Sequence, residues 1–212
     1  MKLFYNLWYQ YGTPPWVIGP RPELVELVEH HRIVPCRAID LGCGVGDNAI
    51  FLAQNGFSVT GVDFSDAAID QAKRKSREAG VTVKFYVDDL THLENRYGTF
   101  DLLVDYGTVD DLTLENRDRY VANILPLTKP GSQFLLWCHE WRLRWWERVL
   151  TRTVSPCGDL AFAPGEAEER FQHAFAIECI ARTTDGPAWE PGSAAYLMTR
   201  RPEPSTTEGS VT

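Results

Sequence analysis

Features that mark several common functional classes are missing from this 212-residue chain. Its five cysteines, an odd number, include no C-x-x-C pair, which argues against a disulfide framework and against a structural zinc site. No apolar run approaches the roughly 20 residues that a membrane span needs, and the first residues lack the basic-then-apolar pattern of a signal peptide. We therefore expect a cytoplasmic protein with no metal and no membrane partner.

Basic clusters are also scarce, and the formal net charge is −8 at pH 7. The densest basic segments, around 73–77 and 142–144, are typical of the solvent-exposed faces of helices. Proteins that bind phosphate backbones need clustered Lys and Arg, so we expect no nucleic-acid partner. A composition of 44% hydrophobic and 24% charged residues is that of an ordinary globular protein, and the length suits one domain.

The most informative stretch of the chain runs from residue 38 to residue 63. A short apolar run ending in an acid leads into a loop with glycines at alternate positions, Gly42, Gly44 and Gly46. A helix over 48–55 and a second apolar run, which ends in Asp63, follow directly. Strand, glycine loop, helix, strand and acid form the layout of a nucleotide-binding crossover. Glycines let the backbone approach a ligand, and the final acid can accept from ribose hydroxyls.

The glycine spacing discriminates between possible nucleotides. A dinucleotide fingerprint, G-x-G-x-x-G, seats a diphosphate on the N-terminus of the helix. Here the third glycine comes one residue early, and Asp47 would repel a diphosphate there, while Asp40 adds a second negative charge. Two carboxylates suit a ligand without phosphates that carries positive charge, such as S-adenosylmethionine with its ammonium and sulfonium centres. The alternatives are a bare glycine turn in another α/β fold and a nicotinamide-dependent oxidoreductase.

On these residues the chain resembles the class I S-adenosylmethionine-dependent methyltransferases, whose first motif is similar to residues 39–46. The resemblance implies an α/β, Rossmann-like fold, with a seven-stranded, mostly parallel sheet, helices on both faces and an antiparallel C-terminal hairpin. The apolar patterns fit strands at 38–41, 58–62, 83–87, 100–104, 133–138, 175–182 and 194–200. They fit helices at 22–31, 48–55, 66–79, 116–127, 140–150 and 166–172.

We expect one domain over residues 1–202. Residues 1–35 would form an N-terminal lid and a first helix, 36–138 the cofactor-binding core, and 139–202 the elements on the acceptor side. The polar residues 203–212 are expected to be a disordered tail.

The resemblance also assigns cofactor contacts, with S-adenosylmethionine as cofactor and S-adenosylhomocysteine as product. The glycine loop would pass around the methionine part, with Asp40 near the ammonium and Asp105 below. Asp63 would accept from both ribose hydroxyls, and Phe64 would pack on the adenine.

An acid pair follows the third predicted strand, in Asp88-Asp89-Leu90. The resemblance implies that one of the two carboxylates accepts from the exocyclic amine of adenine, and we favour Asp89. Both acids could equally serve a turn and a helix cap.

Candidate catalytic residues follow the fourth and fifth predicted strands. Ligands bind beyond the carboxyl ends of the strands in open α/β sheets, so the loop 105–111 should face the transferable methyl group. Asp110 and Asp111 could bind or deprotonate an acceptor, or simply cap the next helix. His139 could act as a general base near neutral pH, or be a solvated or structural histidine.

Residues 1–20 are unusually rich in aromatic side chains. Residues 11–24 resemble the opening segment of the thiopurine, thiol and halide methyltransferases and of their bacterial small-molecule relatives. The resemblance implies a lid over the cofactor, with Trp8, Tyr11 and Trp16 around the sulfonium or the acceptor. Aromatic faces attract cations, and a closed lid excludes water. The alternative is an N-terminal helix that docks on the core.

A second aromatic group lies after the fifth predicted strand, at Trp137, Trp141, Trp145 and Trp146. It could be core, a pocket wall that stacks a flat acceptor, or a dimer patch.

The function expected from these motifs is transfer of methyl from S-adenosylmethionine to an oxygen, nitrogen or sulfur of a small molecule, by in-line displacement. A non-catalytic S-adenosylmethionine-binding protein and a protein methyltransferase are the alternatives. We expect a monomer or homodimer with a small-molecule acceptor.

Overall fold

The computed structural model describes residues 2–12, 14–93, 97–141, 161–183 and 192–202. These residues contain one seven-stranded sheet with the order β3-β2-β1-β4-β5-β7-β6. Its strands are β1 (Arg37–Leu41), β2 (Ser58–Asp63), β3 (Lys84–Val87), β4 (Leu102–Tyr106), β5 (Gln133–Glu140), β6 (Phe175–Thr183) and β7 (Gly192–Arg200). The first five strands are parallel, and β7 runs antiparallel between β5 and β6. The predicted fold class is therefore confirmed.

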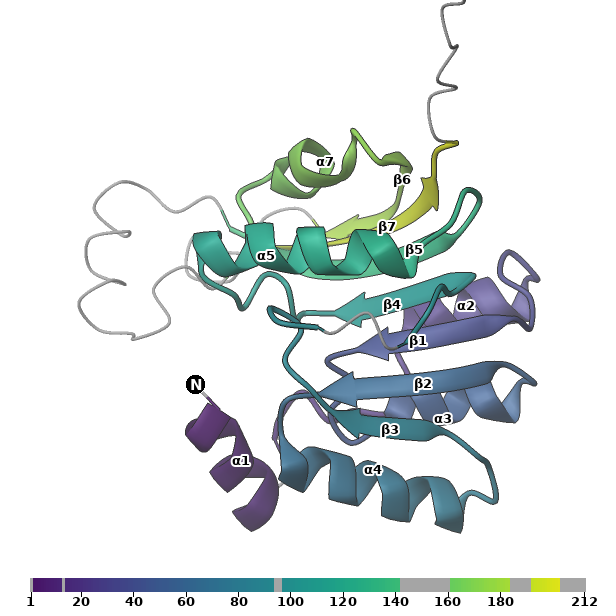
Figure 1. Cartoon of the computed structure of the whole chain (residues 1–212), viewed down its shortest axis with the longest axis vertical. Helices are drawn as coiled ribbons and strands as arrows, with labels where there is room; N and C mark the ends of the chain where they lie inside the picture. Colours follow the sequence, from purple (N-terminus) through teal and green to yellow (C-terminus); the bar gives the residue numbers. More distant parts are fainter. Residues whose placement is uncertain (1, 13, 94–96, 142–160, 184–191, 203–212) are drawn as a thin grey trace, which may run out of the picture.

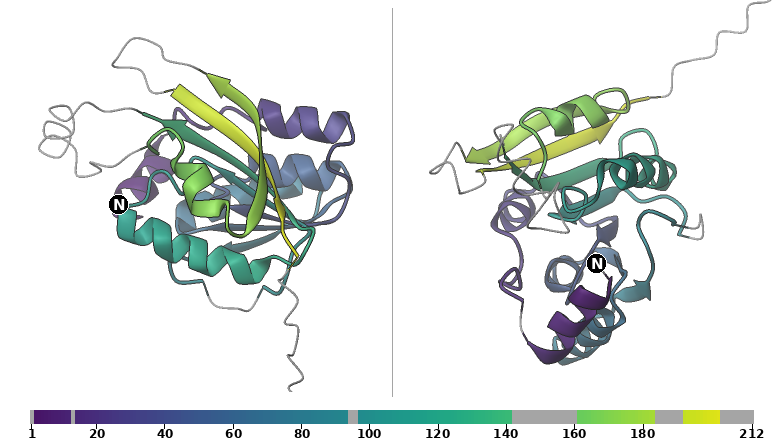
Figure 2. Two further views of the ribbon diagram at one scale, coloured as in Figure 1. Left: turned by 90° about the horizontal axis from the view of Figure 1, so that it is seen from above. Right: turned by 90° about the vertical axis from the view of Figure 1, so that its left-hand side faces the viewer.

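Helices cover both faces of this sheet, as Figure 2 shows. The described helices are α1 (Lys2–Tyr11), α2 (Pro22–Glu29), α3 (Asp47–Gln54), α4 (Asp66–Glu78), α5 (Leu114–Ile124), the 3-10 turn η1 (Leu125–Leu127) and α7 (Glu166–Phe171). The apolar sides of α2, α3 and α4 pack on one face, and those of α5 and α7 pack on the other. Because helices cover both faces, the central strands are almost continuously buried rather than alternating between buried and exposed residues.

The helix α1 lies beside the edge of the sheet toward which the arrowheads of β1, β2 and β4 point (Figure 1). For this segment, the sequence analysis gave a lid as its expectation and an N-terminal helix docked on the core as the alternative. The amide of Gln71 in α4 donates to the backbone oxygen of Tyr9 at 2.6 Å, and Ser65 contacts Asn6. Ser65 is also the N-cap of α4, because its hydroxyl accepts from the backbone N–H of Ala68 at 3.2 Å.

The predicted start of one helix is wrong, where the chain leaves β5. The tryptophan-rich helix was expected to begin at residue 140, but Glu140 is the last residue of β5 and pairs with Gly192 of β7. The rest of that predicted helix, 142–150, lies outside the described residues. Trp141 follows the strand, whereas Trp145, Trp146 and the tail 203–212 lie outside the described residues. The other boundaries differ by a few residues; α5, for example, begins at Leu114 rather than at 116.

In the part of the chain that the structure describes, no helix is both long and apolar enough to cross a membrane. The same residues contain no group of three or more His, Cys, Asp or Glu side chains placed to hold a metal ion.

Candidate functional site

The fold gathers most of the predicted site residues at one edge of the sheet. The glycine loop leaves β1, Asp63 ends β2, the loop with Asp110 and Asp111 follows β4, and His139 lies near the end of β5. Since β1, β2, β4 and β5 are parallel neighbours, their carboxyl ends meet at this edge, where a ligand crevice is expected.

The glycine loop can be formed only by residues without a side chain. All three glycines have positive φ, at 69° for Gly42, 51° for Gly44 and 82° for Gly46. A Cβ on Gly42 would lie 2.1 Å from the hydroxyl of Thr108, and one on Gly44 would lie 2.9 Å from the hydroxyl of Tyr9. The loop is also tied to β2, because the N–H of Gly42 donates to the oxygen of Val62 at 2.8 Å. Its backbone is therefore held close to its neighbours and open to a ligand.

Two carboxylates flank this loop. Asp63, 5% exposed, accepts from the backbone N–H groups of Gly44 at 2.9 Å and Ser65 at 2.8 Å. Burial raises its pKa to about 6, against the effect of these two hydrogen bonds. Asp40 accepts from the backbone N–H of Ala49 in α3 at 3.1 Å, and burial raises its pKa to about 7.

Two more carboxylates lie after β4. Asp105 is fully buried and accepts from the hydroxyl of Tyr120 at 2.5 Å and the N–H of Thr108 at 2.9 Å. Burial raises its pKa to about 8. Asp111 accepts from the hydroxyl of Tyr5 at 3.0 Å, and burial, assisted by the charge of Asp110, raises its pKa to about 6.

These four acids, Asp40, Asp63, Asp105 and Asp111, are called the edge carboxylates below. Across the described ranges, no Lys or Arg nitrogen lies within ion-pair distance of any of them. A ligand that brings positive charge would therefore restore their normal ionisation. These carboxylates fit the positively charged ammonium and sulfonium centres of S-adenosylmethionine, and they do not suit a diphosphate.

Asp110 and His139, predicted separately as catalytic residues, form a pair. One oxygen of Asp110, Oδ2, accepts from the backbone N–H of His139 at 2.8 Å and lies 3.2 Å from its ring Nδ1. The hydrogen bond to Asp110 is the main reason that the pKa of His139 is raised. The other oxygen, Oδ1, is buried and has no hydrogen-bond partner among the described residues. Because Nδ1 faces the carboxylate, Nε2 is the ring nitrogen left to meet an acceptor, and the side chain is 45% exposed.

The N-terminal segment covers the same edge with aromatic rings. The indole N–H of Trp16 donates to the hydroxyl of Tyr9 at 2.8 Å. The ring of Tyr5 has its centroid 5.5 Å from those of Trp16 and Phe64, and the ring of Trp8 lies 4.9 Å from that of Trp16. The first helix therefore docks beside this edge, and its action as a lid over a cofactor stays a prediction.

Tyr11 does not join this cluster, because its side chain is 78% exposed. Sequence reasoning instead missed Tyr5 and Tyr9, which reach Asp111 and Trp16. The spacing of Tyr5 and Tyr9, i and i+4 on a helix, was the signal that could have found them, since such residues share one face. Tyr11 lies two residues beyond Tyr9 and therefore points to the other side.

The acid pair after β3 has partners within the protein. Asp88 accepts from the hydroxyl of Tyr97 at 2.6 Å, and Asp89 accepts from the N–H of Thr91 at 2.8 Å and from its hydroxyl at 2.7 Å. Leu90 is buried. These contacts are those of a turn, and the role of Asp89 toward adenine stays a prediction.

Comparison with known proteins points to one family. The model of a methyltransferase domain matches residues 38–131. An uncharacterized methyltransferase of Schizosaccharomyces pombe is 30% identical over 114 residues, which cover 54% of this chain and 76% of that protein. The 2-heptyl-1-hydroxyquinolin-4(1H)-one methyltransferase of Mycobacteroides abscessus is 33% identical over 127 residues, or 59% of this chain and 56% of that protein.

Human EEF1A lysine methyltransferase 2 is 29% identical over 128 residues, which cover 56% of this chain and 54% of that protein. The chain thus spans about half the length of several curated relatives that it matches. Among solved structures, the Burkholderia thailandensis 1,6-didemethyltoxoflavin-N1-methyltransferase, crystallised with its acceptor and S-adenosylhomocysteine, has the same fold. It superposes with a TM-score of 0.71 at 18% identity, covering 94% of this chain and 87% of that one.

Proposed function

Because the chain belongs to the class I S-adenosylmethionine-dependent methyltransferases, we propose that it transfers a methyl group to an oxygen, nitrogen or sulfur of a small molecule. The observation that carries this proposal is that the edge carboxylates and the Asp110–His139 pair lie at the same edge of the sheet. The first group suits a cationic cofactor, and the second suits an acceptor that must lose a proton.

The roles proposed for the cofactor side follow the geometry. The glycine loop, Asp40 and Asp105 would surround the methionine part, while Asp63 would turn to the ribose, and Phe64, Asp89 and Leu90 would border the adenine. The cover of Tyr5, Tyr9 and Trp16 would exclude water from the site. Residues 1–35 would thus cover the cofactor core 36–138, with residues 139–202 on the acceptor side.

On the acceptor side, His139 Nε2 would accept the proton of a hydroxyl nucleophile, with Asp110 fixing the ring orientation and stabilising the resulting imidazolium. When bound, the cofactor supplies a methyl group on positively charged sulfur, which keeps the C–S electron pair as the acceptor oxygen forms its bond to carbon. Since this step neutralises charge on sulfur, alignment of the nucleophile by the cover and by the β4 and β5 loops would supply much of the rate.

A small-molecule acceptor is favoured by the names of two of the proteins above, which specify heterocyclic acceptors, and by the aromatic cover over the site. The human relative is named for a lysine of a protein, so a protein acceptor is the second candidate. An acceptor screen that includes both classes separates them.

The proposal is tested by calorimetry with S-adenosylhomocysteine, followed by a screen of phenols, thiols, heterocyclic amines and lysine peptides for release of that product. We expect binding by the wild type, and turnover with at least one of the small molecules. A wild-type protein that is folded by circular dichroism but does not bind S-adenosylhomocysteine would contradict the proposal. Turnover with lysine peptides alone would replace it by the second candidate.

A further inference from the structure

The helix α1 rests on the cofactor half of the site. The amide of Gln71 in α4 donates to the backbone oxygen of Tyr9 at 2.6 Å, and the indole N–H of Trp16 donates to the Tyr9 hydroxyl at 2.8 Å. A Cβ on Gly44 would lie 2.9 Å from that hydroxyl, so Tyr9 lies directly against the glycine loop. The position of α1 is therefore tied to α4 and to the loop that is proposed to hold the cofactor.

Tyr5, one turn before Tyr9 on the same helix, lies between the segments that follow β2 and β4. Its ring meets that of Phe64 edge-on, with centroids 5.5 Å apart and planes at 79°. Phe64 follows directly after β2 and is the residue expected to border the adenine. The Tyr5 hydroxyl donates to Oδ2 of Asp111 in the loop after β4 at 3.0 Å. Tyr5 thus touches both the cofactor side and the acceptor side.

Asp111 connects this contact with the candidate base. Its neighbour Asp110 accepts from the backbone N–H of His139 at 2.8 Å and lies 3.2 Å from the ring Nδ1. The hydrogen bond to Asp110 is the main cause that raises the pKa of His139. The charges of Asp110 and Asp111 act in the same direction, while burial and the charge of Arg21 oppose them. The ionisation of Asp111 therefore changes how strong a base His139 is.

The Tyr5 hydroxyl acts on that ionisation. Burial raises the pKa of Asp111 to about 6, the charge of Asp110 adds to this rise, and the hydrogen bond from Tyr5 opposes it. A hydrogen bond that a carboxylate accepts favours its charged form. When α1 is docked, Asp111 therefore carries more negative charge, and the ring of His139 is the stronger base.

We propose that Tyr5 is a positioning residue that couples the cofactor cover to the acceptor side through its contact with Asp111. This inference rests on the proposed function. A cofactor that packs under the cover would favour docked α1, which brings the Tyr5 hydroxyl to Asp111. Coupling between two sites is reciprocal, so a charged Asp111 would in turn favour binding of the cofactor. His139 would thus be most basic when the cofactor is already in place.

The experiment measures the pKa of His139 by NMR titration of its ring, in ligand-free protein and in protein saturated with S-adenosylhomocysteine. The variant His139→Gln assigns the signal. Tyr5→Phe keeps the ring and its packing on Phe64 but removes the hydroxyl. We expect Tyr5→Phe to lower the pKa of His139, and by more in the saturated protein than in the ligand-free protein. Tyr11→Phe on the same helix, whose side chain is 78% exposed, should leave this pKa at its wild-type value.

A double-mutant cycle on the affinity for S-adenosylhomocysteine separates this coupling from a merely structural role of Tyr5. Tyr5→Phe should weaken binding roughly 3- to 10-fold, as the loss of one hydrogen bond allows. In an Asp111→Ala background, the same substitution should change neither the affinity nor the pKa of His139. A loss of affinity that persists in that background would overturn the inference, as would a pKa of His139 that is equal in the wild type and Tyr5→Phe.

Circular dichroism establishes that each variant is folded. If Asp111→Ala does not fold, the comparison of the His139 titration in Tyr5→Phe and Tyr11→Phe decides alone. A wild type that binds no S-adenosylhomocysteine contradicts the proposed function itself, whereas a wild type that binds it without this coupling overturns the present inference and leaves the proposed function standing.

Discussion

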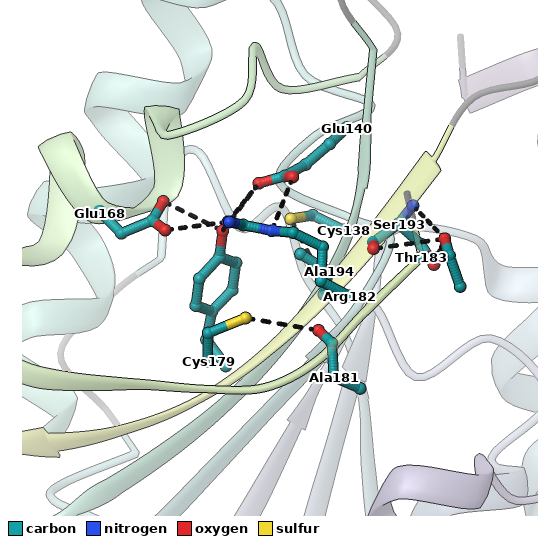
Figure 3. A network of polar contacts seen from close by, with 10 residues as sticks. Cys138, Glu140, Glu168, Cys179, Ala181, Arg182, Thr183, Ser193 and Ala194 are labelled. Atoms are coloured by element: carbon teal, nitrogen blue, oxygen red, sulfur yellow. Dashed lines mark hydrogen bonds and ion pairs between the residues drawn. The ribbon is translucent and has the colours of Figure 1, made fainter. Parts of the chain in front are cut away.

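Two clusters of acids among the described residues differ in the groups that surround their carboxylates. At the carboxyl ends of β1, β2 and β4, the edge carboxylates meet only N–H and O–H donors. At the other cluster, where β5, β7 and β6 meet α7, Arg182 lies between two acids (Figure 3). Its guanidinium is 3.2 Å from Glu140 and 3.0 Å from Glu168, and the hydroxyl of Tyr196 lies within 3.0 Å of both.

This second group, Glu140, Glu168, Arg182 and Tyr196, is called the arginine cluster. Its two carboxylates share the guanidinium of Arg182, and the group ties three strands to a helix, so its role is structural. The edge carboxylates have raised pKa values chiefly because they are buried, and no described Lys or Arg forms an ion pair with them. Acidic side chains therefore have a structural role in the arginine cluster and form a candidate binding site at the edge of the sheet. The difference is that an arginine pairs with the acids of the first group only.

The largest effect is expected on the rate of methyl transfer, in the variant His139→Ala beside the edge carboxylates. Loss of a positioned general base typically costs roughly 10²- to 10⁴-fold in rate. We expect kcat/KM to fall by that factor for a weakly acidic hydroxyl acceptor and by much less for an acceptor already ionised at the assay pH. An equal loss for both acceptors would show that His139 does not take the proton. Ala replacement of His173, an exposed histidine that follows α7, is the matched control.

A smaller effect is expected when an edge carboxylate is removed, in Asp63→Ala. We expect S-adenosylhomocysteine to bind roughly 10- to 100-fold more weakly, because a buried charge-assisted contact is lost. Asp66→Ala, three residues further on at an exposed position in the first turn of α4, should leave the affinity unchanged. Calorimetry on both variants measures this, with thermal denaturation to establish that each is folded. Unchanged affinity in Asp63→Ala would remove this residue from the cofactor site.

A substitution in the arginine cluster should lower the stability of the protein and leave cofactor binding unchanged. Arg182→Ala leaves Glu140 buried without its cation, and because the arginine side chain is 39% exposed we expect a loss of about 1–2 kcal/mol of unfolding free energy. The affinity for S-adenosylhomocysteine should not change. Arg119→Ala, which breaks only an exposed pair with Glu115, should cost less than about 0.5 kcal/mol in the same denaturant titration. A large loss of affinity in Arg182→Ala would show that the two clusters are not independent.

The smallest effect is the pH dependence of stability. The edge carboxylates have folded pKa values of about 6 to 8, above their values of about 4 in the unfolded chain. The folded state therefore holds more protons than the unfolded state between pH 5 and 8, and its stability falls as the pH rises through this window. His139, whose pKa is also raised, contributes in the same direction.

We expect the melting temperature of the ligand-free protein to fall over this window by about 2–4 °C for each kcal/mol of stability lost, and Asp105→Asn to flatten the slope. S-adenosylmethionine should stabilise the protein increasingly as the pH rises, and more steeply than S-adenosylhomocysteine, which lacks the sulfonium charge. A slope of the opposite sign would contradict the assignment of the edge carboxylates as a cation site.

The sequence by itself determined the succession of strands and helices along the cofactor half and the residues near the end of each strand. These features are local: an apolar run, the glycines of the loop and an acid such as Asp63 lie within a few residues of one another. Because parallel strands present their carboxyl ends at one edge, the glycine loop, Asp63, Asp110 and His139 could be placed together without coordinates.

Only the tertiary structure decided which of these residues touch. Asp110 pairs with His139 across 29 positions, and Tyr5 reaches Asp111 across 106, because strand register and the docking of α1 set those contacts. The same long-range order made Glu140 a strand residue and left Tyr11 exposed. Local spacing specifies which face a side chain occupies, but packing between distant segments decides what that face meets.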